Sequence, residues 1–189
     1  MEQLMNTLAE GFDLPILEWI AENLRCSFLD FIMVPITQLG NAGIFWIAIA
    51  LILLLIPKYR RIGLAMGIAL LTGLLLCNII MKPAIARIRP YDYELAHFGK
   101  TIALLIPAQH DFSFPSGHTL ASFEAATVLF LHNKKFGTAA LILACLIAFS
   151  RLYLYVHYPT DVLFSVVLGV AIAFLARFLA QKIPLPQKQ

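Results

Sequence analysis

The stretch S-R-L-Y-L-Y-V-H-Y-P-T-D, from Ser150 to Asp161, is a short polar segment between two long apolar runs. The runs, Phe136 to Tyr153 and Thr160 to Ala180, are each close to the ~20 residues that a helix needs to cross the hydrocarbon core of a bilayer. A polar turn between two such runs is expected where two membrane helices are joined. The sequence therefore predicts an all-α, multi-pass membrane protein.

The composition of the chain agrees with this prediction. Of the 189 residues, 60% are hydrophobic and only 13% are charged, and the mean hydropathy is +0.82. Soluble globular proteins average about 25% charged residues, so a soluble fold is excluded. The cysteines Cys26, Cys77 and Cys145 are far apart and form no C-x-x-C pair. We therefore expect no metal and no redox cofactor.

Three further apolar runs precede these two, and we expect each to form a membrane helix. They are Gly43–Pro57, Ile62–Met81 and Pro115–Leu131. Gly63 and Gly67 in the second run have the small-xxx-small spacing that favours close helix packing. The segment between the second and third runs, from Lys82 to Ser113, is predicted to be a polar loop.

Residues 1–41 are more charged, and their amphipathic pattern favours helices that lie in the membrane interface. We expect one domain over residues 1–189, in which 1–41 form the interfacial segment and 42–182 form a bundle of about five to six membrane helices. An additional span built from residues 12–39 is the alternative. The terminal residues 183–189 are expected to fray, and no removable signal peptide is expected.

The orientation follows from the lysines and arginines of the short loops, which favour the cytoplasmic side. If five spans alternate, three basic clusters fall on one side: Lys58, Arg60 and Arg61; Lys134 and Lys135; Arg177, Lys182 and Lys188. That side is predicted to be the cytoplasm. The polar segments described next then lie on the non-cytoplasmic face of the cell membrane.

The first of these segments reads K-P-A-I-A-R-I-R-P, from Lys82 to Pro90. Lys82 and Arg89 are seven residues apart, which is about two turns if the segment is helical. An ammonium and a guanidinium group on one side of a helix at the membrane surface suit a lipid phosphate. The alternative is that both side chains merely reach from a helix end to the interface.

The second segment reads F-P-S-G-H, from Phe114 to His118. We expect Pro115 at the first helical position, with Phe114 or Ser113 as the cap. Ser116, Gly117 and His118 would then offer free main-chain N–H groups, which form an anion site at a helix start. An ordinary capped helix with an interfacial histidine is the alternative.

The third segment is Ser150–Asp161 itself. Arg151 ends one helix, His157 lies in the turn, and Asp161 lies in the first turn of the next helix. A carboxylate four residues after a histidine can hold one ring nitrogen and leave the other basic, as a histidine nucleophile requires. The alternative for His157 and Asp161 is a capped turn without chemistry.

Taken together and in order, K-x6-R-P, P-S-G-H and S-R-x5-H-x3-D resemble the signature of the type 2 phosphatidic acid phosphatases. These are the membrane branch of a superfamily that includes vanadium haloperoxidases. The resemblance covers Lys82 to Asp161 without a departure from the pattern. It implies that Lys82, Arg89 and Arg151 hold the phosphate oxygens, with further hydrogen bonds from Ser116 and Gly117. It also implies that His157 attacks phosphorus, Asp161 orients His157, and His118 protonates the leaving group, without a metal.

The expected function is thus hydrolysis of a membrane lipid phosphate or diphosphate through a phospho-histidine intermediate. Polyprenyl (undecaprenyl) diphosphate is the first expected substrate, followed by phosphatidylglycerophosphate, phosphatidic acid and diacylglycerol pyrophosphate. A lipid phosphotransferase is the alternative enzyme, and a non-catalytic anion-binding or transport protein is the alternative outside enzymes. We expect the lipid and the bilayer as partners and no nucleic acid, and the sequence leaves the oligomeric state open.

Glu124 has no role in this scheme, although it lies in the middle of the third run. It follows His118 by six residues, about 9 Å along a helix. A carboxyl group at such a depth usually faces protein or a water-filled cavity. Structural pairing with another helix is the first expectation for Glu124, and a role in the substrate cavity is the alternative.

Overall fold

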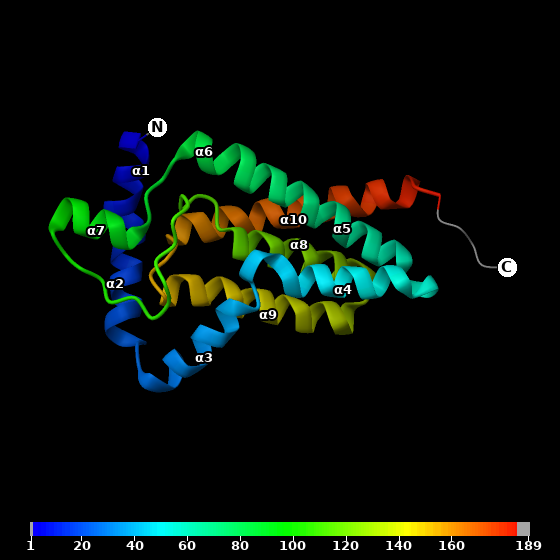
Figure 1. Ribbon diagram of the computed structural model, residues 1–189, viewed down its shortest axis with the longest axis horizontal. Helices are drawn as coiled ribbons and strands as arrows, with labels where there is room; N and C mark the ends of the chain where they lie inside the picture. Colours follow the sequence, from blue (N-terminus) through cyan, green and yellow to red (C-terminus); the bar gives the residue numbers. More distant parts are fainter. Residues whose placement is uncertain (1, 185–189) are drawn as a thin grey trace.

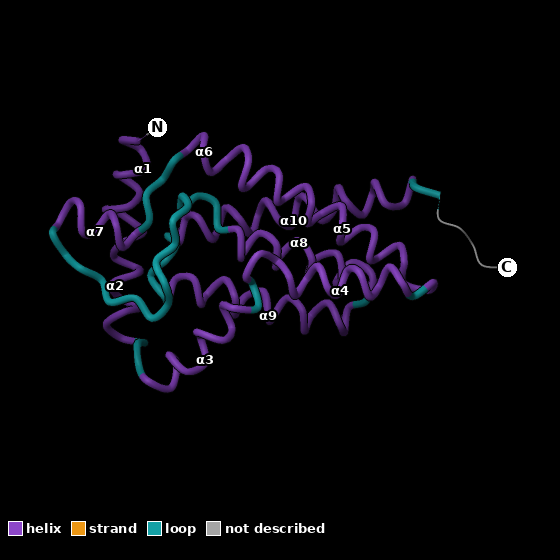
Figure 2. Tube along the Cα trace, in the orientation of Figure 1, coloured by secondary structure: helices purple, strands orange, loops and turns teal. Residues whose placement is uncertain are grey.

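A computed structural model describes residues 2–184 as helices joined by turns and loops, with no strand among these residues (Figures 1 and 2). The all-α prediction is confirmed. The α-helices are α1 (Glu2–Leu8), α2 (Leu14–Asn23), α3 (Ser27–Gln38), α4 (Ile44–Leu55), α5 (Arg60–Leu74), α6 (Lys82–Ile85), α7 (Pro90–Phe98), α8 (Gly117–His132), α9 (Lys134–Tyr153) and α10 (Pro159–Lys182). Short π and 3-10 elements are η1 (Ala9–Asp13), η2 (Asn41–Gly43), η3 (Pro57–Tyr59) and η4 (Leu75–Met81). Most of the predicted C-terminal tail lies outside the described residues.

Five helices, α4, α5, α8, α9 and α10, run along the long axis of the molecule, while α1 and α2 lie across one end with α7 beside them (Figure 1). They correspond to the five apolar runs of the sequence. α8 is the central helix, because it packs against α4, α5, α9 and α10. Its residues are buried on every side, from Thr119 to Val128, as expected for a helix without a solvent face.

Glycine allows the closest helix contacts. A Cβ atom on Gly137 of α9 would lie 2.0 Å from the Cα atom of Phe130 in α8. A Cβ atom on Gly63 of α5 would lie 2.5 Å from the carbonyl oxygen of Ala50 in α4. The predicted packing role is therefore confirmed for Gly63 but is wrong for Gly67, which has no atom within 4 Å of a built Cβ.

We expect Gly137→Ala to destabilise the protein by at least about 1–3 kcal/mol, because overpacking against a main-chain atom cannot be relieved by a rotamer change. The measurement is thermal unfolding of the purified protein in detergent. Gly67→Ala is the matched control, since it adds the same methyl group to a helix where there is room, and alanine favours helix over glycine. Equal melting temperatures for the two variants would contradict the proposed contact.

Three helical segments are long and apolar enough to cross a membrane, and a fourth span results if α3 and the segment Asn41–Leu55, bent by 45°, count as one. α8 has 16 residues, which is shorter than the ~20 of a full span. The predicted number of crossings therefore remains a prediction. Within residues 2–41, α1, η1, α2 and α3 form the predicted helical segment, and α2 and α3 contact α9. The place of this segment in the interface also remains a prediction.

The prediction of a polar loop from Lys82 to Ser113 is wrong in its first half. α6 and α7 form within it, separated by a reversal at Ala86, which has a left-handed backbone (φ 51°). The seven-residue spacing suggested that Lys82 and Arg89 lie on one continuous helix, but they do not. Both side chains nevertheless line the same cavity.

Candidate active site

A cavity of about 460 Å³ opens between α4, α5 and α8. Most of its wall is apolar, and its polar end lies where the three polar segments of the sequence meet. Six of the eight predicted site residues line it: Lys82, Arg89, Gly117, His118, Arg151 and His157. Asp161 lies behind His157, and Ser116 lies outside the lining.

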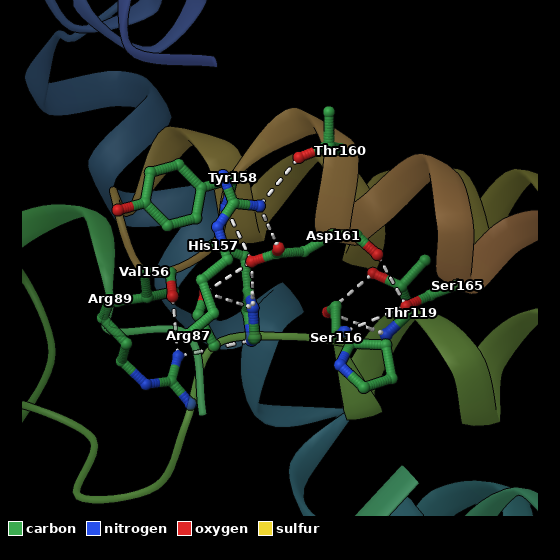
Figure 3. A network of polar contacts seen from close by, with 12 residues as sticks. Arg87, Arg89, Ser116, Thr119, Val156, His157, Tyr158, Thr160, Asp161 and Ser165 are labelled. Atoms are coloured by element: carbon green, nitrogen blue, oxygen red, sulfur yellow. Dashed lines mark hydrogen bonds and ion pairs between the residues drawn. The ribbon is translucent and has the colours of Figure 1, made fainter. Parts of the chain in front are cut away.

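Arg89 links two of the polar segments. Its Nη1 donates to the carbonyl oxygen of Val156 at 2.6 Å and lies 3.3 Å from Nε2 of His157 (Figure 3). The side chain is 3% exposed. A buried guanidinium is thus held directly beside one ring nitrogen of the predicted nucleophile.

Arg151 supplies a third cation from the last turn of α9, where the sequence placed it. Its Nη1 donates to the hydroxyl of Thr37 in α3 at 2.5 Å. Its buried Nε has no hydrogen-bond partner among the described residues. Because a buried N–H without a partner is costly, Arg151 is ready to donate to an anion in the cavity.

His157 lies in the turn between α9 and α10, and its side chain is almost completely buried. Nδ1 lies 3.4 Å from Oδ2 of Asp161 and 3.4 Å from the hydroxyl of Ser113, so Nε2 is the nitrogen that faces Arg89 and the cavity. Burial, together with the charges of Arg89 and Arg151, lowers the pKa of His157 well below the ordinary histidine value. The ring is therefore neutral, and nucleophilic, at neutral pH.

Asp161 is fully buried and makes more contacts than the predicted one with His157. Oδ2 accepts hydrogen bonds from the Tyr158 main-chain N–H at 3.1 Å and from the Ser113 hydroxyl. Oδ1 accepts from Arg87 Nη1 at 2.6 Å (Figure 3). The carboxylate is thereby fixed in the first turn of α10 and cannot rotate away from the histidine.

Two residues that no sequence pattern indicated, Arg87 and Asp13, lie behind Asp161. Arg87 also donates to Oδ2 of Asp13 at 2.7 Å, and its guanidinium lies 3.6 Å from the centre of the Tyr158 ring. Asp13 in turn accepts from the main-chain N–H of Thr160 at 2.8 Å. Asp13 lies in a segment with an amphipathic pattern, and no sequence spacing relates it to Thr160, almost 150 positions later.

Ser116 lies just before α8 and not in its first turn, where the sequence predicted it. It is the N-cap of α8, which begins at Gly117 and not at Pro115. Its hydroxyl accepts from the Thr119 N–H at 3.4 Å, and its own N–H donates to the Ser165 hydroxyl at 2.9 Å (Figure 3). Both groups are already bonded within the protein, so a phosphate contact from Ser116 remains a prediction.

His118, in the first turn of α8, reaches the cavity as predicted. Its Nε2 lies 2.8 Å from Oδ1 of Asn41, a neighbour that the sequence did not suggest. Gly40 makes room for the ring, because a Cβ atom there would lie 2.6 Å from Cδ2 of His118. The role of His118 as a proton donor remains a prediction.

Comparison with known proteins agrees with this geometry. The PAP2 superfamily matches residues 58–183. The chain belongs to the PAP2 superfamily. An undecaprenyl-diphosphatase of Sulfolobus acidocaldarius is 32% identical over 167 residues, 88% of this chain and 77% of that protein. A phosphatidylglycerophosphatase B of Bacillus subtilis is 33% identical over 173 residues, 85% of this chain and 79% of that protein.

The fold is also similar to a solved structure. The crystal structure of Aquifex aeolicus LpxE aligns with a TM-score of 0.74 and 25% identity, over 87% of this chain and 93% of that one. The resemblance inferred from the three motifs is thus confirmed, and this PAP2 chain is an integral membrane protein.

Glu124 lies in the wall of the same cavity, and its Oε1 has no hydrogen-bond partner among the described residues. The side chain is 1% exposed and faces Gly73 of α5, where a Cβ atom would lie 2.0 Å from Oε1. The first expectation, that Glu124 pairs with another helix, is wrong. Glu124 does line the cavity, while the alternative, a role of Glu124 in a substrate cavity, remains a prediction.

The geometry predicts how the three cations respond to charge-conserving exchange. Arg89→Lys and Arg151→Lys should each lose about tenfold or more in kcat/KM, because an ammonium group cannot replace the fixed fork of a guanidinium. Lys82→Arg should cost less, since a single positive charge suffices there. Phosphate release under subsaturating substrate is the measurement. Full activity of both lysine variants would show that only charge is needed.

Proposed function

We propose that this PAP2 protein hydrolyses the phosphate or diphosphate of a membrane lipid through a phospho-histidine intermediate. The observation that carries the proposal is the position of His157. One ring nitrogen lies beside Asp161 and the other beside Arg89, at the polar end of a largely apolar cavity. A lipid can place its phosphate at the cations and its tail along the apolar wall.

The proposed reaction follows from the requirements of phosphoryl transfer. Positive charge must stabilise the equatorial oxygens, and the nucleophile and leaving group must be in line. Lys82, Arg89 and Arg151 supply the charge. Nε2 of His157 attacks phosphorus while His118 protonates the departing oxygen. Water then attacks the phospho-histidine, and His118 takes the proton from that water.

Two substrate classes have support, and polyprenyl diphosphate is our first choice. The Sulfolobus acidocaldarius relative is named an undecaprenyl-diphosphatase, and the Bacillus subtilis relative a phosphatidylglycerophosphatase B. The leucines that α4 and α5 contribute to the cavity wall can contact either kind of tail: Leu51, Leu54, Leu70, Leu71 and Leu74. The phosphate chemistry at His157 is the same for both classes.

The test is phosphate release from a panel of purified lipids in the presence of EDTA, with the wild type and His157→Ala. The panel contains undecaprenyl diphosphate, phosphatidylglycerophosphate, phosphatidic acid and diacylglycerol pyrophosphate. We expect metal-independent release by the wild type, fastest from undecaprenyl diphosphate, and none by His157→Ala. Phosphate release that EDTA abolishes, or that persists in His157→Ala, would contradict the proposed mechanism.

We further propose that the site faces the non-cytoplasmic side of the cell membrane. The support is the common side of the basic clusters around Lys58 and Lys134, at the opposite end of α4, α5, α8 and α9 from the motif residues. We expect a cysteine introduced at position 59 or 134 to resist an impermeant thiol reagent in intact cells. Labelling of intact cells at either position would reverse the orientation.

A further inference from the structure

Asp111, in the loop between α7 and α8, contacts two of the three cations that we assign to the substrate phosphate. Its Oδ1 accepts a hydrogen bond from Arg89 Nη2 at 2.6 Å, and its Oδ2 is paired with Nζ of Lys82. Arg89 Nε also donates to the main-chain oxygen of Asp111 at 2.9 Å. Carboxylate and phosphate oxygens use the same donors of a guanidinium. Asp111 and a substrate phosphate therefore need the same hydrogen bonds.

The carboxylate is charged under all conditions in which a phosphatase is assayed. Partial burial alone would raise the pKa of Asp111, but hydrogen bonds and charge from Lys82 and Arg89 outweigh it and hold the pKa well below the usual range. A carboxyl group with a lowered pKa stays ionised at every pH above that value. Asp111 is therefore ionised at neutral pH, as its ion pairs with Lys82 and Arg89 require.

Asp111 differs from Asp161 in how firmly it is held. Its side chain is 53% exposed, whereas that of Asp161 is fully buried. The loop is anchored on both sides of Asp111. The Tyr91 hydroxyl donates to the carbonyl oxygen of Gln109 at 2.9 Å and accepts from its N–H at 3.0 Å. The Ser113 N–H donates to the main-chain carbonyl oxygen of Arg87 at 2.8 Å. The carboxylate can therefore turn toward water by side-chain rotation while the loop anchors stay in place.

We propose that Asp111 is an internal competitor for the phosphate site, which leaves Lys82 and Arg89 when a substrate phosphate binds and returns when inorganic phosphate departs. This inference rests on the proposed function. A phosphate ligand can bind fully only to molecules in which the Asp111 contact is open. Its apparent Kd is therefore the intrinsic Kd divided by the fraction of open molecules. Asp111 thus weakens the binding of substrate and product alike, and it speeds the release of inorganic phosphate.

The exchange is favourable for a substrate because its phosphate offers more than the carboxylate does. A phosphate monoester carries about −1.5 to −2 charges at pH 7, whereas Asp111 carries one. The phosphate also has an oxygen for Arg151. The Nε of Arg151 has no partner among the described residues, and Arg151 makes no hydrogen bond to Asp111 there. A substrate can bind at Arg151 first and then displace Asp111 from the other two cations.

The test is inhibition of the purified full-length enzyme by inorganic phosphate, in Asp111→Asn and Asp111→Ala. The control is Asp92→Asn, which removes an exposed carboxylate from the first turn of α7. We expect the inhibition constant of phosphate and the KM of the lipid to fall together, by about tenfold, in both Asp111 variants. We expect kcat not to rise, because tighter binding of inorganic phosphate slows its release and does not speed the chemical step. Asp92→Asn should match the wild type.

The outcomes separate this inference from the proposed function. Unchanged or weaker phosphate inhibition in an active Asp111→Asn enzyme overturns the competitor role and makes Asp111 a part of the site that positions the cations. A wild type that releases no phosphate from any lipid of the panel and binds no labelled orthophosphate overturns the proposed function itself. Binding of labelled orthophosphate to His157→Ala, with and without Asp111→Asn, gives the same comparison without turnover.

Discussion

His157→Ala is expected to abolish phosphate release from every lipid, because no covalent intermediate can form without the nucleophile. His118→Ala should instead reduce activity by an amount that depends on the leaving group. Loss of a general acid typically costs a factor of about 10²–10⁴. We expect the larger loss for a monoester such as phosphatidic acid, whose alkoxide needs the proton. A smaller loss is expected for a diphosphate, whose leaving phosphate is a weaker base.

The structure gives the reason for assigning the two roles in this way. Only His157 has a carboxylate and a hydroxyl at one ring nitrogen and a guanidinium at the other, so its Nε2 is both oriented and next to the phosphate site. His118 has the amide oxygen of Asn41 at its Nε2. An amide can orient a ring that donates a proton, but it does not increase the basicity of a nucleophile as a carboxylate does.

The decisive measurement is phosphate trapped on the protein by rapid quench with labelled substrate. A phospho-histidine is labile in acid and stable in base, which distinguishes it from a serine ester. We expect to trap it in the wild type and, for longer, in His118→Ala, where water attack lacks its base. Trapping in His157→Ala but not in His118→Ala would mean that the two histidines have exchanged roles.

The sequence predicted the main helices and six residues of the cavity lining because both depend on local patterns. Apolar runs of spanning length predicted α4, α5, α8, α9 and α10, and the three motifs placed His157, Arg151 and Arg89 near one another. The helix start before His118 was wrong by two residues, since the cap is Ser116 rather than a residue before Pro115. A serine that caps a helix and a serine that binds an anion look the same in a motif.

Contacts between distant residues could not be predicted from the sequence. Asp13 reaches Arg87 and Thr160 only because the N-terminal segment packs across the end of the bundle. Asp111 reaches the cations only because a loop folds over them. Charged residues in an interface or in a polar loop are usually solvated, so neither position stood out.

Arg87→Ala is expected to have the largest effect on stability. Arg87 lies between the carboxylates of Asp13 and Asp161, at 2.7 and 2.6 Å, and all three side chains are almost completely buried. Removing the guanidinium leaves two buried carboxylates without a cation. Breaking a buried ion pair in this way typically costs about 3–5 kcal/mol. We expect a large fall in the melting temperature in detergent, together with loss of activity because Asp161 no longer holds His157.

Two further variants show whether the charge network, rather than the loss of any arginine or lysine, is responsible. Lys100→Ala removes a half-exposed cation that is paired with Glu18, and such an exposed pair contributes about 1 kcal/mol or less. Lys100 also lies 3.4 Å from the buried Glu94, which keeps its hydrogen bond from the Tyr155 hydroxyl in the variant. Asp13→Asn keeps an oxygen for Thr160 and leaves Arg87 paired with Asp161. We expect it to retain most of the activity, because one buried cation then faces one buried carboxylate. Equal melting temperatures for Arg87→Ala and Lys100→Ala would show that the buried network does not stabilise the site. Asp161 would then be positioned by Ser113 and the Tyr158 N–H alone.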